Sequence, residues 1–344
     1  MNKMQERNLG FELLRLISMF SIVYGHIQAM TTASVFNPIG SMGDINCFVL
    51  ITGYFMIEGR FKSQRFFRLA IETVFYSFVI SALFYCLTHQ VGVPDVLKSA
   101  FPFAPTRYSY WFINKFLALI VLQPFLVKLV SVLNKRQYQL LLLALIMINS
   151  TLVIAFPFSS IFNNGWSLSW MVTVFLIGGY IRKYDLLPNY QNGGGKWLFF
   201  VILVYVSGKY FPKYINIQYN QWFFFMKSLC MFMWMKQIQL THHSFVGRFV
   251  QWASPNTLAV YLIHNQILLL PVIIGLGACL IPNGSSAILQ TIIWSAYTLV
   301  VMIACILIDK IRLWLFLQCR INQAISTISS AFDKRLQLWM HSNS

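Results

Sequence analysis

Long apolar stretches dominate this sequence. A helix of about 20 apolar residues can cross a bilayer core of about 30 Å, and 58% of the 344 residues here are hydrophobic. We predict ten transmembrane helices, at approximately residues 10–30, 40–57, 66–88, 108–132, 138–156, 166–182, 196–211, 219–238, 256–281 and 285–309. The expected fold class is an all-α polytopic membrane bundle. A soluble globular domain carries about a quarter charged residues, so the 10% found here exclude an ordinary cytosolic enzyme.

The basic residues indicate the orientation of the chain. Lys and Arg number 26 against 9 Asp and Glu, a formal charge of +17. With residue 1 in the cytoplasm, 18 of these 26 residues fall on the inner side, four on the outer side and four within spans. Inner loops of membrane proteins are enriched in this way, so both termini are predicted to be cytoplasmic. Topology accounts for most of the charge, and no nucleic-acid partner is needed to explain it.

The chain divides into a transmembrane domain, residues 1–312, and a tail, residues 313–344. Apolar residues recur every three or four positions in the tail, with Lys and Arg between them. This pattern predicts an amphipathic helix on the inner membrane surface. Six scattered cysteines lack C-x-x-C spacing, and we interpret them as small apolar residues rather than as a metal site or disulfides.

Three ionisable residues lie inside the first predicted span: Glu12, Arg15 and His26. Each such group costs about 2.5–3.5 kcal/mol in a membrane, so it usually faces a cavity or a partner. Arg15 and His26 are eleven residues apart, which places them on one helix face about 16 Å apart along the axis. Arg15 then lies near the inner surface and His26 towards the outer leaflet. In the alternative interpretation, Glu12 and Arg15 form an i,i+3 ion pair and His26 bonds a neighbouring carbonyl.

The second predicted span brings Asp44 and Asn46 to about the depth of His26. A carboxylate beside a histidine fixes the tautomer of the ring and raises its basicity for general-base chemistry. We therefore predict Asp44 as the orienting group of His26, an adjacency inferred from depth.

Four cations follow the second span within nine residues: Arg60, Lys62, Arg65 and Arg68. A juxtamembrane basic cluster binds lipid headgroups, which is one interpretation. Arginine also presents a planar fork to phosphate oxygens. Because Arg65 and Arg68 lie one turn apart at the start of a helix, the cluster predicts a phosphate site.

Five short motifs follow one another along the chain, namely Arg15-x10-His26, Asn46 with Thr52-Gly53-Tyr54, Arg65-x-x-Arg68, Tyr110-Trp111-Phe112 and Tyr261-x-x-His264. In this order they resemble the motifs of the acyltransferase family 3 membrane proteins. Thr52 stands where Ser is commoner in the family. The resemblance covers approximately residues 8–310.

The resemblance implies transfer of an acyl group, usually acetyl, from cytoplasmic acyl-CoA to a hydroxyl of a cell-surface glycan or lipid-linked sugar at the outer face. It implies an O-acetyltransferase of the bacterial plasma membrane that modifies polysaccharide. Acetyl-CoA is then a donor substrate, and no bound cofactor is expected. His26 acts as general base on the acceptor hydroxyl or accepts the acyl group first, and Arg15 lines the acyl-CoA channel or counters negative charge.

Aromatic and amide residues gather at the outer ends of several spans. Trp111, Asn114, Lys115 and Asn46 are the candidates for binding the acceptor. Rings in this position also form the ordinary interfacial belt of a membrane protein, which is the alternative.

Three further residues, Glu12, Tyr261 and His264, are candidate channel residues. His264 is expected near the inner third of the ninth span, as either a channel residue or a packed histidine.

Two other function classes remain open from the sequence. Charges within spans also mark the substrate path of a transporter or flippase for a lipid-linked sugar or small anion, although no repeat of paired broken helices is evident. A non-catalytic scaffold would not need Arg15 and His26 on one face. The expected partners are acyl-CoA, the saccharide acceptor, membrane lipids and, as an open alternative, a second copy of the chain in a homodimer.

Overall fold

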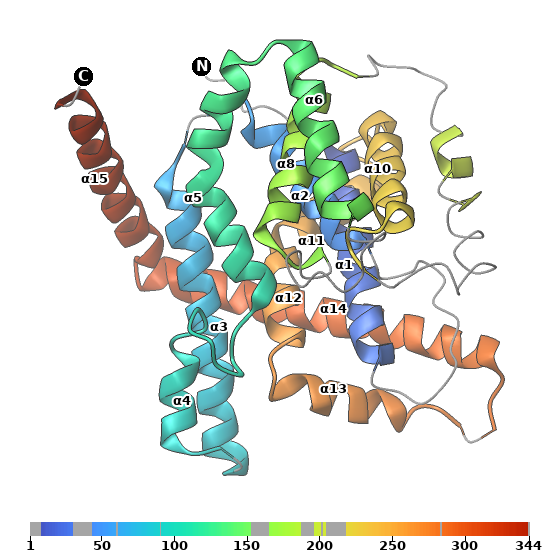
Figure 1. The fold of residues 1–344 in the computed structure, drawn as a ribbon. Helices are drawn as coiled ribbons and strands as arrows, with labels where there is room; N and C mark the ends of the chain where they lie inside the picture. The colour runs from blue at the N-terminus through green and yellow to red at the C-terminus, as the bar shows by residue number, and fades with distance from the viewer. Residues whose placement is uncertain are drawn as a thin grey trace.

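The computed structural model describes residues 8–29, 43–59, 61–89, 91–152, 165–186, 196–200, 202–203, 218–282 and 284–342. All regular elements in these ranges are helices, shown in Figure 1. They are α1 (Leu9–Ala29), α2 (Asp44–Met56), α3 (Ser63–Thr88), α4 (Val93–Ser99), α5 (Trp111–Val132), α6 (Lys135–Ile146), η1 (Met147–Thr151), α8 (Leu168–Lys183), α10 (Trp222–Gln237), α11 (Phe245–Ala253), η4 (Ser254–Asn256), α12 (Thr257–His264), α13 (Leu269–Ala278), α14 (Ala287–Gln318) and α15 (Ile321–Ser342).

Side-chain caps fix where several of these helices begin. Asn8 accepts hydrogen bonds from two backbone N–H groups at the start of α1, and Ser167 and Ser286 each accept one at the starts of α8 and α14. Such caps satisfy N–H groups that have no partner within the helix. From its cap, α1 runs to Ala29, so Arg15 and His26 lie on one continuous helix as predicted.

The helix α1 lies between two apolar cores. One core packs α1 against α3, α5, α12 and α14, and includes Leu16 and Met19. The other packs α1 against α2, α6, α8 and α10, and includes Leu14. Arg15 and His26 stay half-buried between these packed positions. The two cores therefore hold α1 and fix the positions of its polar residues.

Four described helices are long and apolar enough to cross a membrane: α1, α3, α5 and α14. A fifth candidate is a bent pair, in which α11 and α12 together are followed by α13 at 93°. The fold is therefore all-helical with membrane-spanning helices, as predicted. The count of ten spans and the cytoplasmic termini stay predictions, and most of the predicted span 196–211 lies outside the described residues.

Three of the predicted spans form shorter helices: α2, α8 and α10, with 13, 16 and 16 residues. Helix α2 is buried among α1, α8 and α10. A Cβ added at Gly53 would lie 2.0 Å from the carbonyl oxygen of Phe175, and one at Gly178 would lie 2.3 Å from that of Leu50. Small residues allow such close helix contact in membranes. A short apolar run can be a buried core helix rather than a span, which explains the difference in length.

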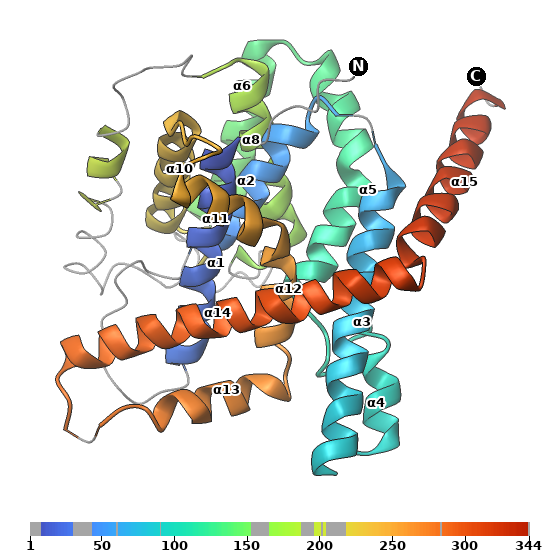
Figure 2. The ribbon, with the colours of Figure 1, turned by 180° about the vertical axis from the view of Figure 1, so that it is seen from behind.

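In the C-terminal part, α14 continues to Gln318 before α15 begins, and the domain division at residue 312 stays a prediction. Figure 2 shows α14 crossing the bundle, where it contacts α1 and α12. After the turn, α15 packs against α3. The last helix of the chain, α15, begins at Ile321, and its place on the inner membrane surface stays a prediction.

Candidate functional site

Two histidines from distant parts of the chain form a pair. His26 lies near the end of α1, and His264 is the last residue of α12. The Nδ1 atom of His26 lies 3.0 Å from Nε2 of His264, and the ring centroids are 5.2 Å apart. His264 is completely buried, whereas His26 is half-buried. His26 is therefore the more exposed member of the pair.

His264 was predicted near the inner third of a span that starts at residue 256, and its depth in a membrane stays a prediction. The helical segment in fact begins at Phe245 and continues through the turn Ser254–Asn256 to His264. Twenty helical residues rise about 30 Å, so His264 lies at the far end of this segment. The end of α1 meets it there.

The predicted pairing of Asp44 with His26 is not formed among the described contacts. The Asp44 carboxylate instead lies 3.2 Å from Nζ of Lys227 on α10 and accepts a hydrogen bond of 2.6 Å from Ser21 on α1. Asp44 is completely buried. A buried charge needs a charged or strongly hydrogen-bonding partner, and Lys227 supplies one. Sequence reasoning placed Lys227 within a span, and that intramembrane cation was the available signal for this pair.

At the other end of α1, Glu12 and Arg15 form an ion pair of 2.8 Å. This is the i,i+3 pair of the alternative interpretation. The Arg15 side chain is 31% exposed and that of Glu12 is 10% exposed. Arg15 therefore keeps an accessible side, and it lies about 16 Å along α1 from His26.

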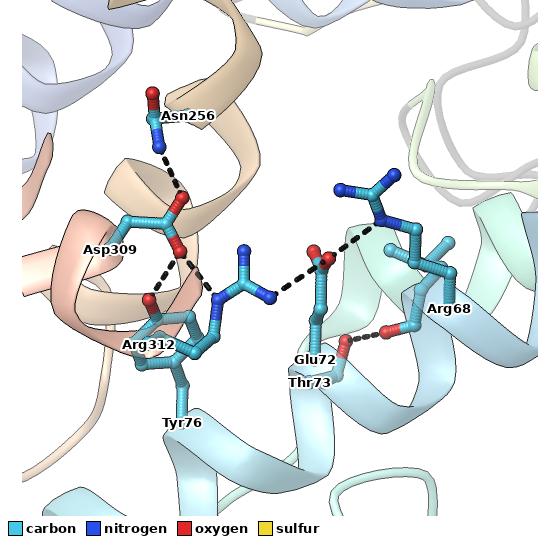
Figure 3. Close-up of polar contacts among 8 residues, drawn as sticks. Arg68, Glu72, Thr73, Tyr76, Asn256, Asp309 and Arg312 are labelled. Atoms are coloured by element: carbon cyan, nitrogen blue, oxygen red, sulfur yellow. Dashed lines mark hydrogen bonds and ion pairs between the residues drawn. The ribbon is translucent and has the colours of Figure 1, made fainter. Parts of the chain in front are cut away.

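The cationic cluster lies at the start of α3. Lys62, Arg65 and Arg68 are all exposed at or beside the first turns of this helix, and Arg60 lies outside the described residues. Arg68 donates from Nε to Glu72 over 2.9 Å. Figure 3 shows its terminal nitrogens directed away from Glu72. These nitrogens are thus placed to bind an anion.

Behind Arg68, a buried polar network joins α3 to α14 (Figure 3). Arg312 lies 3.2 Å from Glu72 and 2.6 Å from Asp309, and Tyr76 donates to Asp309 over 2.6 Å. Asn256 also donates to Asp309. Sequence analysis counted Arg312 among the inner-surface charges, but its side chain is only 4% exposed. The i,i+3 spacing of Asp309 and Arg312 was the signal for this network.

The C-terminal helix reaches the same end of α3. Ser63 donates its backbone N–H to Asp333 over 3.3 Å and its hydroxyl to the carbonyl oxygen of Ser329 over 3.1 Å. The Phe67 ring meets that of Phe332 edge to face, with centroids 5.9 Å apart. The first turn of α3, which carries the exposed cations, is thus held by α15.

Three aromatic residues form a cluster at the starts of α5, α8 and α10. The rings of Trp111 and Trp166 stack with centroids 5.1 Å apart and an interplanar angle of 12°. The Tyr219 ring lies 5.7 Å from Trp111 and 6.2 Å from Trp166. Trp166 is 46% exposed, so this aromatic cluster presents a ring surface to a ligand.

The predicted acceptor-binding polar residues have different surroundings. Asn46 is buried, accepts from Trp170 over 3.0 Å and donates to the carbonyl oxygen of Tyr219 over 2.9 Å. It therefore supports the aromatic cluster rather than facing a ligand. Asn114 donates to Ser109 over 2.8 Å, and both Asn114 and Lys115 are half-buried on the first turn of α5.

Ring contacts lead from the aromatic cluster to the histidine pair. The Phe112 ring lies 5.9 Å from Trp111 and 5.9 Å from Tyr261. The buried ring of Tyr261 lies 6.1 Å from His264. Tyr261, predicted as a channel residue, thus lies between Phe112 and His264 in this series of ring contacts.

The fold and site define a helical protein with candidate membrane spans that carries a histidine pair, an aromatic cluster and an exposed cationic cluster. The chain belongs to acyltransferase family 3, whose acyltransferase domain matches residues 8–310. No curated protein and no solved structure matches the chain. The family assignment predicted from the motifs is confirmed over nearly the whole chain.

Proposed function

We propose that this protein transfers an acyl group, by preference acetyl, from cytoplasmic acyl-CoA to a hydroxyl of a cell-surface glycan or lipid-linked sugar. Its place of action is the bacterial plasma membrane. The observation that carries the proposal is that the partly exposed His26 lies 3.0 Å from His264. His26 also lies on the same helix as Arg15. Membership of an acyltransferase family supports the reaction class.

The donor side of the proposed site lies where α1 and α3 begin, at the same end of the bundle (Figure 1). Lys62, Arg65 and Arg68 are exposed there, and arginine forks suit phosphate oxygens. We assign the CoA phosphates to this cluster. The pantetheine arm then extends past Arg15 towards His26, along a rise of about 16 Å.

The chemistry assigned to His26 is proton transfer from the acceptor hydroxyl. As the imidazole takes the proton, the hydroxyl oxygen attacks the thioester carbonyl and forms the ester bond. The C–S bond then breaks, and the CoA thiolate takes the proton back from the imidazolium. In the two-step variant the imidazole attacks the thioester first, and the C–S bond breaks to release the CoA thiolate. The hydroxyl oxygen then attacks the acyl carbon, the C–N bond breaks, and the hydroxyl proton passes to the thiolate.

The acceptor side is assigned to the aromatic cluster of Trp111, Trp166 and Tyr219. Aromatic faces pack well against the apolar faces of sugar rings, and the stacked pair of tryptophans leaves Trp166 partly exposed. Ring contacts through Phe112 and Tyr261 connect this cluster to the histidine pair. A hydroxyl of a bound sugar is thereby brought towards His26.

Purified protein in nanodiscs, supplied with acetyl-CoA labelled in the acetyl group and a panel of glycans, tests this function. We expect label on a glycan, and loss of that transfer in His26→Ala while melting temperature and gel-filtration profile stay unchanged. His243→Ala is the matched control, because His243 is exposed and lies outside the site. Passage of glycan across a vesicle membrane without acetylation would instead identify a transporter or flippase.

A further inference from the structure

A ring nitrogen of His26 faces a ring nitrogen of His264. The hydrogen bonds around the two rings determine which ring nitrogens are protonated. Nδ1 of His264 is 2.5 Å from the carbonyl oxygen of Val260, one turn earlier in α12. A carbonyl oxygen only accepts hydrogen bonds, so this Nδ1 carries a proton and donates it. The other nitrogen of a neutral imidazole is an acceptor. Nε2 of His264 therefore accepts, and Nδ1 of His26 donates, across their 3.0 Å contact.

A doubly protonated His264 would reverse this hydrogen bond. Its side chain is completely buried, and its hydrogen-bond partners among the described residues are the Val260 carbonyl and His26, with no carboxylate. A buried charge without a counter-ion is costly. The neutral form of His264 is thus the one that this site favours.

The backbone that follows His264 is anchored. Immediately after α12, Gln266 accepts hydrogen bonds from the N–H groups of Leu268 and Leu269, at 2.6 and 3.2 Å, and so caps the start of α13. Its amide also donates to Ser81 on α3 over 3.2 Å. Irregular backbone at membrane depth is tolerated where protein packing satisfies it. These bonds fix the bend that presents His264 to the end of α1.

We propose that His264 is a positioning residue for acyl transfer: it accepts the Nδ1 proton of His26 and leaves Nε2 of His26 with the free lone pair. This inference rests on the proposed function of His26. A second ring nitrogen held by a hydrogen bond decides which nitrogen is reactive. Because His264 is completely buried and His26 is partly exposed, His264 acts only through His26 and does not touch the substrate.

The same arrangement serves both routes of transfer. When Nε2 of His26 takes the proton of the acceptor hydroxyl, the ring becomes an imidazolium and the Nδ1–H bond to His264 becomes charge-assisted, which strengthens it. When Nε2 attacks the thioester instead, the same lone pair forms the acyl–nitrogen bond. In either route, a proton on Nε2 at the start would block the reaction.

Two substitutions separate positioning from packing. His264→Leu fills space but accepts no hydrogen bond, whereas the side-chain oxygen of His264→Gln can accept one. We expect His264→Leu to lower kcat by about 100-fold, the size of a general-base contribution, with the KM for acetyl-CoA unchanged. His264→Gln should recover most of that loss. Equal activities of the two variants, or a change confined to KM, would overturn the proposal.

A measurement that does not use activity decides the tautomer directly. In full-length protein with 15N-labelled histidine in nanodiscs, the His26 signals are identified by their loss in His26→Ala. We expect Nδ1 to be protonated and Nε2 unprotonated in the wild type, and the Nε2-protonated tautomer to grow in His264→Leu. A wild-type His26 protonated on Nε2 would refute the assignment. If the wild type transfers no acyl group, the proposed function fails, while these spectra still decide the role of His264.

Discussion

Arg312 on α14 lies 3.2 Å from the carboxylate of Glu72 on α3, and the two side chains are only 4% and 7% exposed. Through Glu72, this buried ion pair reaches Arg68 near the N-terminal end of α3. The last long helix of the bundle therefore supports the carboxylate that orients one of the proposed phosphate-binding arginines.

Replacing Arg312 by Met tests how much this ion pair contributes to the free energy of unfolding. The change leaves Asp309 buried without its cation and leaves Glu72 with only the exposed Arg68, and breaking a buried pair costs about 3–5 kcal/mol. We expect a large fall in the free energy of unfolding, measured by denaturant titration in detergent. The control is Arg182→Met, whose partner Glu58 is 54% exposed; an exposed pair contributes about 0–1 kcal/mol. Similar losses in both variants would contradict the assigned role of Arg312.

For the Asp44–Lys227 pair we predict that a second substitution restores stability lost in the first. Asp44→Asn leaves the Lys227 ammonium in a buried position without its carboxylate, at a cost of about 3–5 kcal/mol. Adding Lys227→Met removes the second charge, so the double variant should regain much of the lost stability. Melting temperatures of the two single variants and the double variant measure this coupling. Losses that simply add would show that the two residues do not act as a pair.

Binding of CoA tests the cationic cluster. A ligand that binds only the folded state stabilises it by about 2.7 kcal/mol at a concentration of 100 Kd. We expect CoA to raise the melting temperature of the wild type and of Arg248→Ala, whose arginine is exposed on α11. The rise should shrink in Arg65→Ala and Arg68→Ala. If all four proteins shift equally while anionic lipid stabilises only those with both arginines, the cluster binds lipid headgroups.

Substitution of Trp166 tests the aromatic cluster. A stacked ring contributes about 0.5–1.5 kcal/mol beyond its buried area, so Trp166→Ala should raise the KM for the acceptor about 2- to 10-fold. The KM for acetyl-CoA should not change, because Trp166 is assigned to the acceptor side. Trp252→Ala serves as the control, since Trp252 is exposed on α11. A rise in the donor KM instead would contradict the assignment.

Local periodicity was sufficient to predict the arrangement along single helices. Arg15 and His26 share α1 because the spacing of eleven residues and the absence of a helix breaker are properties of one segment. The start of α3 beside Arg65 and Arg68 was predicted in the same way. The ordered motifs also led to the family that matches the chain.

Contacts between helices could not be predicted from local periodicity. The predicted span began at residue 256, but the helical segment begins at Phe245 and continues through η4, where proline is tolerated in the first turn. The partner of His26 therefore differed from the one expected. Likewise, Asp44 pairs with Lys227 because two buried side chains of opposite charge, 183 residues apart in the sequence, lie side by side in the fold.

The account depends most directly on acyl transfer through His26. Its test is a single-turnover measurement with labelled acetyl-CoA and an accepting glycan, comparing the wild type, His243→Ala and His26→Ala at equal amounts of folded protein. We predict that the first two acetylate the glycan and that His26→Ala is slower by about 100-fold or more. Equal rates in His26→Ala and the wild type would contradict the central claim.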